Sequence, residues 1–398
     1  MTSERPTDRA LPHRAVAIWL WLCTALLLGM IVVGGVTRLT GSGLSIVRWE
    51  PIVGALPPLN GSEWERVFAL YKETPQFRLV NSHMDLDAFK SIFWWEYFHR
   101  LLGRSIGIVV ALPLVFFTLK RWIERRRAIV LVGIFCLGGV QGLIGWLMVK
   151  SGLVDAPHVS HIRLTLHLVT GMLIFALVLW QAVDATWARS RARGLAEVSA
   201  EALTPVRRWA MLVTTLAAVT VTSGGLVAGL RSGHAFPTFP LIAGYWVPPG
   251  MFVADPLWLN FFDNVTLVQF QHRLLAYSVA LAVLGTWLSA RRRPLPNPAR
   301  WAVRLLVAAV TLQITLGITT LLLHVPVWAA AAHQGNAALV LAACLNLVHA
   351  LAIRVPHTSE AGERLRSREG PVSPSLSMGR NSASGSISHS GSGTSSIR

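Results

Sequence analysis

Eight long apolar runs divide this chain and favour a bundle of membrane-spanning helices over any other fold. A helix needs about 20 apolar residues to cross the hydrocarbon core of a bilayer, whereas a closed barrel would show short segments of alternating polarity. Only 14% of the 398 residues are charged, against roughly 25% in soluble domains. We therefore predict an all-α polytopic membrane protein. The predicted spans are 15–37, 94–119, 128–149, 162–184, 209–230, 266–290, 302–324 and 328–352.

Basic residues in the connections between these runs predict how the chain is oriented. Residues 120–127 and 185–208 each contain five Lys or Arg and 291–300 contains four, whereas 150–161 and 231–265 contain one each. Because Lys and Arg accumulate in cytoplasmic loops, this alternation predicts that both termini are cytoplasmic. The same clusters account for much of the formal charge of +17, so we expect contacts with lipid headgroups and no nucleic-acid binding.

The segments outside the runs complete the expected domain organisation. Residues 1–14 form a basic cytoplasmic leader that continues into an apolar run without a cleavage site, which indicates an uncleaved anchor in a bacterial inner membrane. The outer segment 38–93 is rich in Trp, Pro and Gly, and we expect an ordered cap there, with a plain spacer as the alternative. Residues 185–208 are a cytoplasmic linker. The Ser-rich residues 353–398 are expected to be a disordered cytoplasmic tail.

Short motifs recur in the same order in the two halves of the chain. They predict that 15–184 and 209–352 are parallel repeats, each a four-helix bundle, related by an axis along the membrane normal. The outer segment 231–265 would then be the counterpart of 38–93. The matches are Gly34-Gly35 with Gly224-Gly225, Ser42-Gly43 with Ser232-Gly233, His99-Arg100-Leu101-Leu102 with His272-Arg273-Leu274-Leu275, Gln141 and Gly145 with Gln313 and Gly317, and His167 with His333.

Four histidines occupy equivalent places in the even-numbered predicted spans: His99, His167, His272 and His333. Each lies about 8–9 Å into the membrane from its outer end, at 1.5 Å per residue. Two imidazoles that face each other across a helical bundle are suited to haem iron. Zinc would need further Cys or carboxylate ligands nearby, and a proton relay would need acids at mid-membrane; neither pattern is present. A single buried histidine that only bonds to its neighbours is the alternative.

Charged residues beside the histidines distinguish the two halves. Arg100, Arg104 and Arg273 could bind haem propionates, or extend towards outer headgroups instead. Glu96 precedes His99 by three residues, while the neutral Gln269 holds the same place before His272. A buried carboxyl group can exchange protons near neutral pH. We therefore expect chemistry in the N-terminal half and electron transfer in the C-terminal half, with a Glu96–Arg100 ion pair as the alternative for Glu96.

These motifs together resemble the haem A synthase family over residues 15–350. The resemblance rests on Glu96-Tyr97-x-His99-Arg100 with Gly103-Arg104, on Arg163-Leu164-x-x-His167, on Gln271-His272-Arg273 and on His333-Gln334. The segment Thr37-Arg38-Leu39-Thr40-x-Ser42-Gly43 is similar to the first outer loop of the proteobacterial and mitochondrial branch. The outer loops lack the cysteine pairs of the Gram-positive branch. His161 departs from the family pattern, where Tyr is expected. We interpret it as a surface residue near the haem edge, with a spare ligand as the alternative.

The resemblance implies an activity and a set of partners. Haem A synthases oxidise the C8 methyl group of haem O to a formyl group through successive hydroxylations, and haem A then serves terminal cytochrome oxidases. By the same resemblance, His99 and His167 hold the substrate haem towards the periplasmic side, His272 and His333 ligate a resident haem b, and Glu96 is the catalytic acid. Haem O synthase and oxidase subunit I or its assembly factors are the implied partners, and a homo-oligomer is left open. A di-haem electron-transfer cytochrome b and a haem carrier are the rival functions.

Overall fold

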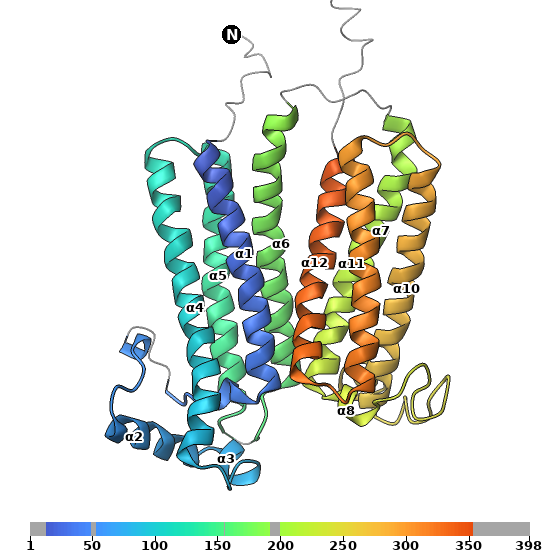
Figure 1. Cartoon of the computed structure of the whole chain (residues 1–398). Coiled ribbons are helices and arrows are strands. Elements are labelled where there is room, and N and C mark those ends of the chain that lie inside the picture. The colour runs from blue at the N-terminus through green and yellow to red at the C-terminus, as the bar shows by residue number, and fades with distance from the viewer. Residues whose placement is uncertain (1–12, 49–52, 155, 192–199, 353–398) are drawn as a thin grey trace, which may run out of the picture. The chain divides into compact units, whose positions relative to one another are not determined.

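The computed structural model describes residues 13–48, 53–154, 156–191 and 200–352. Within these residues the chain is helical, without a β-strand, and eight helices are long and apolar enough to cross a membrane. This confirms the predicted multi-pass, all-α architecture (Figure 1). The eight are α1 (Arg14–Leu39), α4 (Leu86–Leu119), α5 (Arg125–Ser151), α6 (His161–Arg191), α7 (Ala200–Gly229), α10 (Val265–Arg291), α11 (Asn297–Leu322) and α12 (Val327–Leu351).

Three helices extend well beyond the predicted spans. The helix α4 begins eight residues before the predicted residue 94, α6 continues seven residues past 184, and α7 begins nine residues before 209. These extensions carry charges that end a hydropathy window but do not end a helix. The described parts of the predicted linker 185–208 are therefore helical. Of the predicted leader 1–14, only residues 13 and 14 are described. The predicted tail 353–398 lies wholly outside the described residues.

The helices pack in two groups with matching contacts. The helix α1 packs against α4 and α6, and α5 packs against α6; in the second group, α7 packs against α10 and α12, and α11 packs against α12. The groups meet where α6 contacts α7, α1 contacts α12, and α6 contacts α12. This pattern agrees with the predicted parallel repeat, in which α1 corresponds to α7 and α6 to α12, although the repeat and its orientation in the membrane stay predictions.

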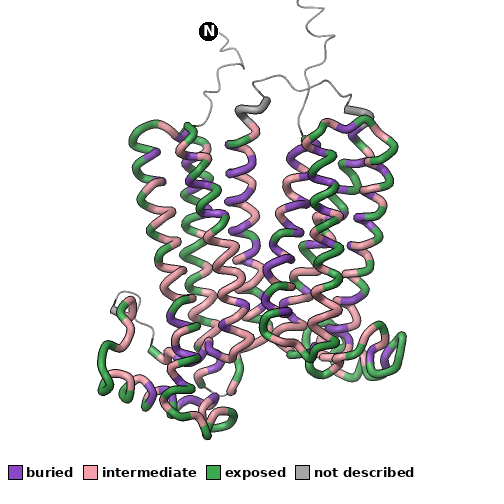
Figure 2. The backbone as a smooth tube through the Cα atoms, viewed as in Figure 1, coloured by how far each residue is buried: buried purple, intermediate pink, exposed green. Residues whose placement is uncertain are grey.

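Burial follows from this arrangement. In the most apolar window of each span, 56% of α12 and 39% of α6 is buried, against 11% of α4 and of α11, so α6 and α12 lie at the centre (Figure 2). A cluster formed by Met172, Phe175 and Leu179 of α6 with Ala338 and Leu341 of α12 joins the two groups. The outward faces of the peripheral helices are apolar and exposed, as expected of surfaces that contact lipid.

The connections at one end of the helices are long and folded, and we call this end the loop end (the lower end in Figure 1). It carries η1 (Ser42–Leu44), η2 (Val53–Ala55), α2 (Gly61–Lys72), α3 (Pro75–Leu79), α8 (Ser232–Ala235), η3 (Leu257–Leu259) and α9 (Asn260–Asp263). The loop end is the side that the charge pattern predicts to be outside.

The extension of α4 has a clear role at the loop end. Its first turn is capped by Asp85, whose side chain accepts a hydrogen bond from the Ala88 amide at 2.8 Å. Phe89 then packs on Phe68 and Tyr71 of α2, and both Phe89 and Tyr71 are fully buried. The ring stacking of Phe68 and Phe89, with centroids 5.0 Å apart, holds α2 on α4. The described part of the outer segment 38–93 is thus a folded unit.

Candidate active site

Each of the four histidines rests on a glycine of a neighbouring helix. A β-carbon on that glycine would lie within about 3.3 Å of the imidazole Cε1 atom, closer than side chains normally approach. Only glycine therefore leaves room for the ring. The pairs, with the distance from such a β-carbon to Cε1, are Gly34 and His99 (3.0 Å), Gly145 and His167 (2.9 Å), Gly224 and His272 (3.3 Å), and Gly317 and His333 (3.0 Å).

These glycines fix the level of the rings along the bundle. Gly34 lies five residues before the end of α1, and Gly224 and Gly317 lie five residues before the ends of α7 and α11. Gly145 lies six residues before the end of α5. All four helices end at the loop end, so the four rings share nearly one level, about 8 Å inside it at 1.5 Å per residue.

The imidazoles present one free edge. In all four, the Nδ1 atom is buried against the neighbouring helix, although the residue as a whole is only half-buried. The edge that carries Nε2 is thus the accessible one. His99 is close enough to His167 for their charges to interact, and so is His272 to His333. The structure therefore brings together the two pairs that the sequence predicts, one in each half.

This donor set fits a haem iron better than a protein-only metal site. Within the described residues, no three His, Cys, Asp or Glu side chains gather as they would around a bound ion. Two imidazoles alone are too few for zinc, but they suffice for a metal whose other ligands come from a porphyrin. His333 differs from the others, because Gln313 Nε2 lies 3.3 Å from its Nε2 atom. Iron binding there would require this amide to turn away.

The two matched glutamines support the histidine-bearing helices in different ways. Gln141 donates to the backbone carbonyl of His167 at 2.8 Å. Gln313 instead accepts a hydrogen bond from Asn336 at 2.8 Å through its own carbonyl oxygen. The sequence motif shows both glutamines, but the different partners are visible only in the structure.

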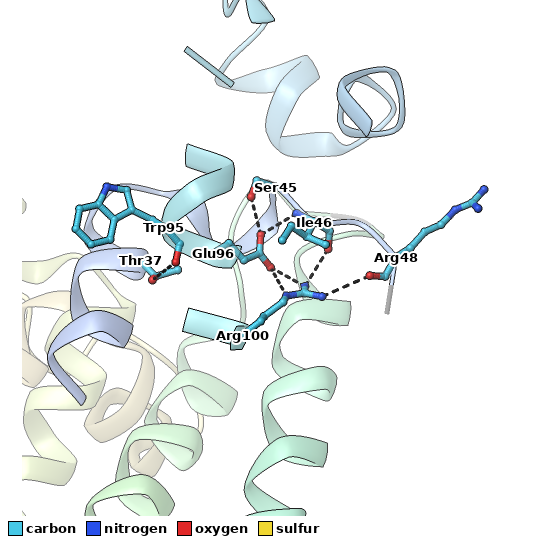
Figure 3. A network of polar contacts seen from close by, with 7 residues as sticks. All are labelled: Thr37, Ser45, Ile46, Arg48, Trp95, Glu96 and Arg100. Atoms are coloured by element: carbon cyan, nitrogen blue, oxygen red, sulfur yellow. Dashed lines mark hydrogen bonds and ion pairs between the residues drawn. The ribbon is translucent and has the colours of Figure 1, made fainter. Parts of the chain in front are cut away.

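Glu96 lies one turn nearer the loop end than His99 and is only 2% exposed. Figure 3 shows its carboxylate surrounded by donors. Oε2 accepts hydrogen bonds from the Ser45 hydroxyl and the Ile46 amide, each at 2.7 Å. Oε1 accepts from Arg100 Nε at 3.0 Å and from Nη2 at 2.6 Å. The Glu96–Arg100 ion pair, predicted as an alternative role for Glu96, is therefore present. Both carboxylate oxygens accept hydrogen bonds from protein donors.

The equivalent position in the other half has the opposite surroundings. Gln269 is also 2% exposed, and its Nε2 atom donates to the backbone carbonyls of Ser232 at 3.2 Å and Phe236 at 3.1 Å. Acceptors therefore face the amide where donors face Glu96. The Glu96–Gln269 difference in sequence is matched by a difference in the outer segment that closes over each residue.

Arg100 and Arg273 fasten these outer segments to the bundle. Arg100 donates to the carbonyl of Ile46 at 2.9 Å. Arg273 donates to the carbonyls of Thr238 at 2.7 Å, Pro240 at 3.1 Å and Leu241 at 3.3 Å. The half-buried Arg104 lies one turn further along α4 from Arg100. This fastening role is not visible in the sequence, because the carbonyls come from loops 32 to 54 residues away. Binding of propionates by the three arginines stays a prediction.

Further contacts join the two halves at the loop end. His161 Nε2 lies 2.6 Å from Asp263 Oδ1, and the His161 side chain is 22% exposed, so it is neither a plain surface residue nor placed as a ligand. Gln334, next to His333, donates to the Ile31 carbonyl of α1 at 2.7 Å. Gly225 and Gly229 let α7 approach α6, because a β-carbon there would collide with Thr165 and His161.

Comparison with known proteins agrees with this geometry. Residues 17–345 match the COX15-CtaA family, described as cytochrome oxidase assembly proteins. The chain is 49% identical over 351 residues to the heme A synthase of Nitrosospira multiformis, covering 88% of this chain and 97% of that protein. It is 47% identical to the heme A synthase of Nitrosomonas eutropha over 84% of this chain and 92% of that protein. For the heme A synthase of Parvibaculum lavamentivorans the identity is 43%, over 85% and 95%. The chain therefore belongs to the COX15-CtaA family of cytochrome oxidase assembly proteins and, within it, to the haem A synthases.

Proposed function

We propose that this chain is a membrane oxidoreductase that converts haem O to haem A by oxidising the C8 methyl group to a formyl group. The observation that carries the proposal is the pair of glycine-seated imidazoles in each half, with buried Nδ1 atoms and one free edge, in a chain 49% identical to a heme A synthase over nearly its whole length.

The N-terminal half binds the substrate haem and the C-terminal half binds the haem cofactor. His99 and His167 hold the iron of the substrate haem, and His272 and His333 hold a resident haem b. When bound, haem b supplies a one-electron redox centre. The seats on Gly34, Gly145, Gly224 and Gly317 fix the ring orientations before any haem enters, which lowers the ordering cost of binding.

The substrate changes in two oxidations followed by dehydration. In sum the methyl group and one water molecule become a formyl group, and an external acceptor takes up the four electrons and four protons. The hydroxymethyl group and the gem-diol are the stages between, each reached by loss of two electrons, and loss of water from the gem-diol leaves the formyl group. Glu96 is the proposed acid beside this site. Its carboxylate is held by Ser45, Ile46 and Arg100, so taking up a proton at Oε1 requires Arg100 to release that oxygen. Arg100 retains the Ile46 carbonyl as a partner when it does so.

The surroundings of the enzyme follow from the same proposal. The chain resides in a bacterial inner membrane with its haem sites on the periplasmic side and both termini in the cytoplasm. It receives haem O from haem O synthase and delivers haem A to oxidase subunit I or its assembly factors. The orientation is supported by the basic loops opposite the loop end.

Analysis of bound pigment tests this function. The full chain is produced together with a haem O source, purified, and its haems are extracted and separated by chromatography. We expect haem b together with haem O or haem A. His99→Ala and His167→Ala should remove haem O and haem A but keep haem b, while His272→Ala and His333→Ala should remove haem b. The exposed His83→Ala is the matched control.

Two results would contradict the proposal. Two equivalents of haem b, without any haem O or haem A, would identify a di-haem electron-transfer protein. Haem A production that persists undiminished in Glu96→Gln would remove Glu96 from the chemistry and leave a carrier as the function of the N-terminal half.

A further inference from the structure

A pocket of about 280 Å³ opens at the loop end between the two helix groups. It lies away from the Glu96 network and is lined from both halves of the chain. The polar lining residues are Arg38, Thr40, Gln76, Asn81, His158, Arg231 and His234. None of the lining residues in the described part of the chain is acidic. Drug-sized ligands occupy roughly 300–1,000 Å³, so this pocket suits a small group and not a macrocycle.

Among the described residues, no carboxylate lines the pocket beside its two guanidinium groups. Arg38 is half-buried at the end of α1, and among the described residues its side chain makes no hydrogen bond or ion pair. It is close enough to Arg231 for their like charges to interact. Arg231 donates only to His158 Nδ1, at 3.1 Å. Two like charges held together in this way favour an anion between them.

The histidines add to the same bias. Burial, and then Arg231, lowers the pKa of His158; burial, followed by Arg38, Arg231 and His324, lowers the pKa of His234. An anion in the pocket would offset these positive neighbours and favour the protonated imidazoles. The pocket can therefore supply two fixed positive charges and a further one that forms at His234 when an anion binds, while His158 Nδ1 accepts a hydrogen bond from Arg231.

The lining is held in place by contacts that do not use up its donors. Gln76 donates to the Gly41 carbonyl at 2.9 Å and accepts from the Tyr71 hydroxyl at 3.1 Å, while Asn81 donates to the Tyr71 oxygen at 2.7 Å. Tyr71 is fully buried against α4. This network fixes the wall formed by the first outer segment. A helix C-terminus would account for one arginine in its last turn, but not for convergence with Arg231 and two imidazoles.

We propose that this pocket binds an oxyanion, a carboxylate or a phosphate, between Arg38 and Arg231. Forked guanidinium groups recognise both oxyanions through paired hydrogen bonds. The anion bridges the end of α1 and the turn between α7 and α8. It therefore connects the two halves of the chain on the loop-end side of the four histidines.

Two sources can supply this chemistry. One is the phosphate of an anionic lipid in the outer leaflet, because the pocket opens at the end of membrane-spanning helices. The other is a haem propionate. Arg38 lies four residues after Gly34, the seat of His99, which is about 6 Å further out along α1. The haem source rests on the proposed function, whereas binding of phosphate does not.

The test compares three forms of the full chain in detergent. They are the wild type, the double variant Arg38→Gln with Arg231→Asn, and Arg66→Gln, which removes an exposed charge from α2 away from the pocket. Asn is chosen at position 231 because the backbone there is left-handed, with φ 54°. Affinity for inorganic phosphate is measured from the rise in thermal midpoint at constant ionic strength. We expect the double variant to bind phosphate at least about tenfold more weakly, because it loses two charge-assisted contacts.

Two further arms identify the source. Nanodiscs of phosphatidylcholine with or without phosphatidylglycerol show whether anionic lipid co-purifies, and titration with haem or its dimethyl ester shows whether free propionates strengthen binding. Dependence of either on the two arginines supports the proposal and names the source. Equal phosphate affinity in the double variant and Arg66→Gln would overturn the proposal. It would also be overturned if neither the co-purification of anionic lipid nor the binding of haem changed in the double variant. If the double variant fails to fold, Arg38→Gln alone gives the same test, since the Arg38 side chain has no partner to lose within the described part of the chain.

Discussion

Replacing Glu96 with Gln tests whether the outer segment is held by this carboxylate. Glutamine has the same shape but only one acceptor oxygen. If its amide group faces Arg100, two donors confront each other; if it faces Ser45 and Ile46, the Ile46 amide loses its acceptor. Either rotamer leaves a buried donor without a partner, so the change is not conservative.

The magnitude follows from the burial of the pair. Removing one partner of a buried ion pair costs roughly 3–5 kcal/mol. The Glu96 side chain is 3% exposed, but that of Arg100 is 19% exposed, and Arg100 keeps the Ile46 carbonyl. We therefore expect a cost at or just below the lower end of this range, about 2–4 kcal/mol. Because 1.4 kcal/mol is about a factor of ten, opening of this segment should become roughly a hundredfold more frequent.

Amide hydrogen exchange measures this effect directly. Peptides that contain Ile46 should exchange about a hundredfold faster in Glu96→Gln than in the wild type. Glu65→Gln, an exposed acid of α2, is the matched control and should change nothing. The reciprocal change Gln269→Glu should loosen residues 232–236, because a carboxylate would face the Ser232 and Phe236 carbonyls. Unchanged exchange at Ile46 in Glu96→Gln would refute the reasoning.

Three further perturbations give equally direct outcomes. Gly145→Ala should displace the His167 ring, because the new β-carbon would lie 2.9 Å from its Cε1 atom, and the haem absorption spectrum should change; Gly142→Ala, with nothing within 4 Å, should leave the spectrum as it is. Asn260→Ala should expose the loop 250–264 to protease, because the fully buried Asn260 side chain forms hydrogen bonds with the backbone of Val253, Ala254 and Leu257. Loss of these hydrogen bonds should lower the stability of the loop by about 2–4 kcal/mol. Undiminished protease resistance would argue against this role. Acidification from about pH 7.5 to 5.5 should lower the thermal midpoint, because the pKa values of His158 and His234 lie below 6.5 in the folded chain, so the unfolded chain binds protons first as the pH falls through about 6.5. Phosphate should reduce that loss, and both effects should be smaller in a double His158→Gln, His234→Gln variant.

The membrane-spanning helices and the four histidines could be predicted from the residues alone, because they depend on local composition and motif spacing. Apolar runs of bilayer length require helices, because unpaired backbone groups are too costly in hydrocarbon, and all eight were found. The repeated His-Arg-Leu-Leu motif and the matched glycines located the four histidines, and the structure brought them into the two expected pairs. These features were predictable because hydropathy and motif spacing are properties of the chain alone.

The contacts of each polar side chain could not be predicted from the sequence and became visible in the folded chain. The sequence shows Glu96 and Gln269 as an acid and an amide, but donors surround the first and acceptors the second, and these come from outer segments distant in the chain. The convergence of Arg38 with Arg231, from residues 193 positions apart, was equally invisible. Such contacts depend on how loops fold over helix ends, and no local periodicity encodes that arrangement.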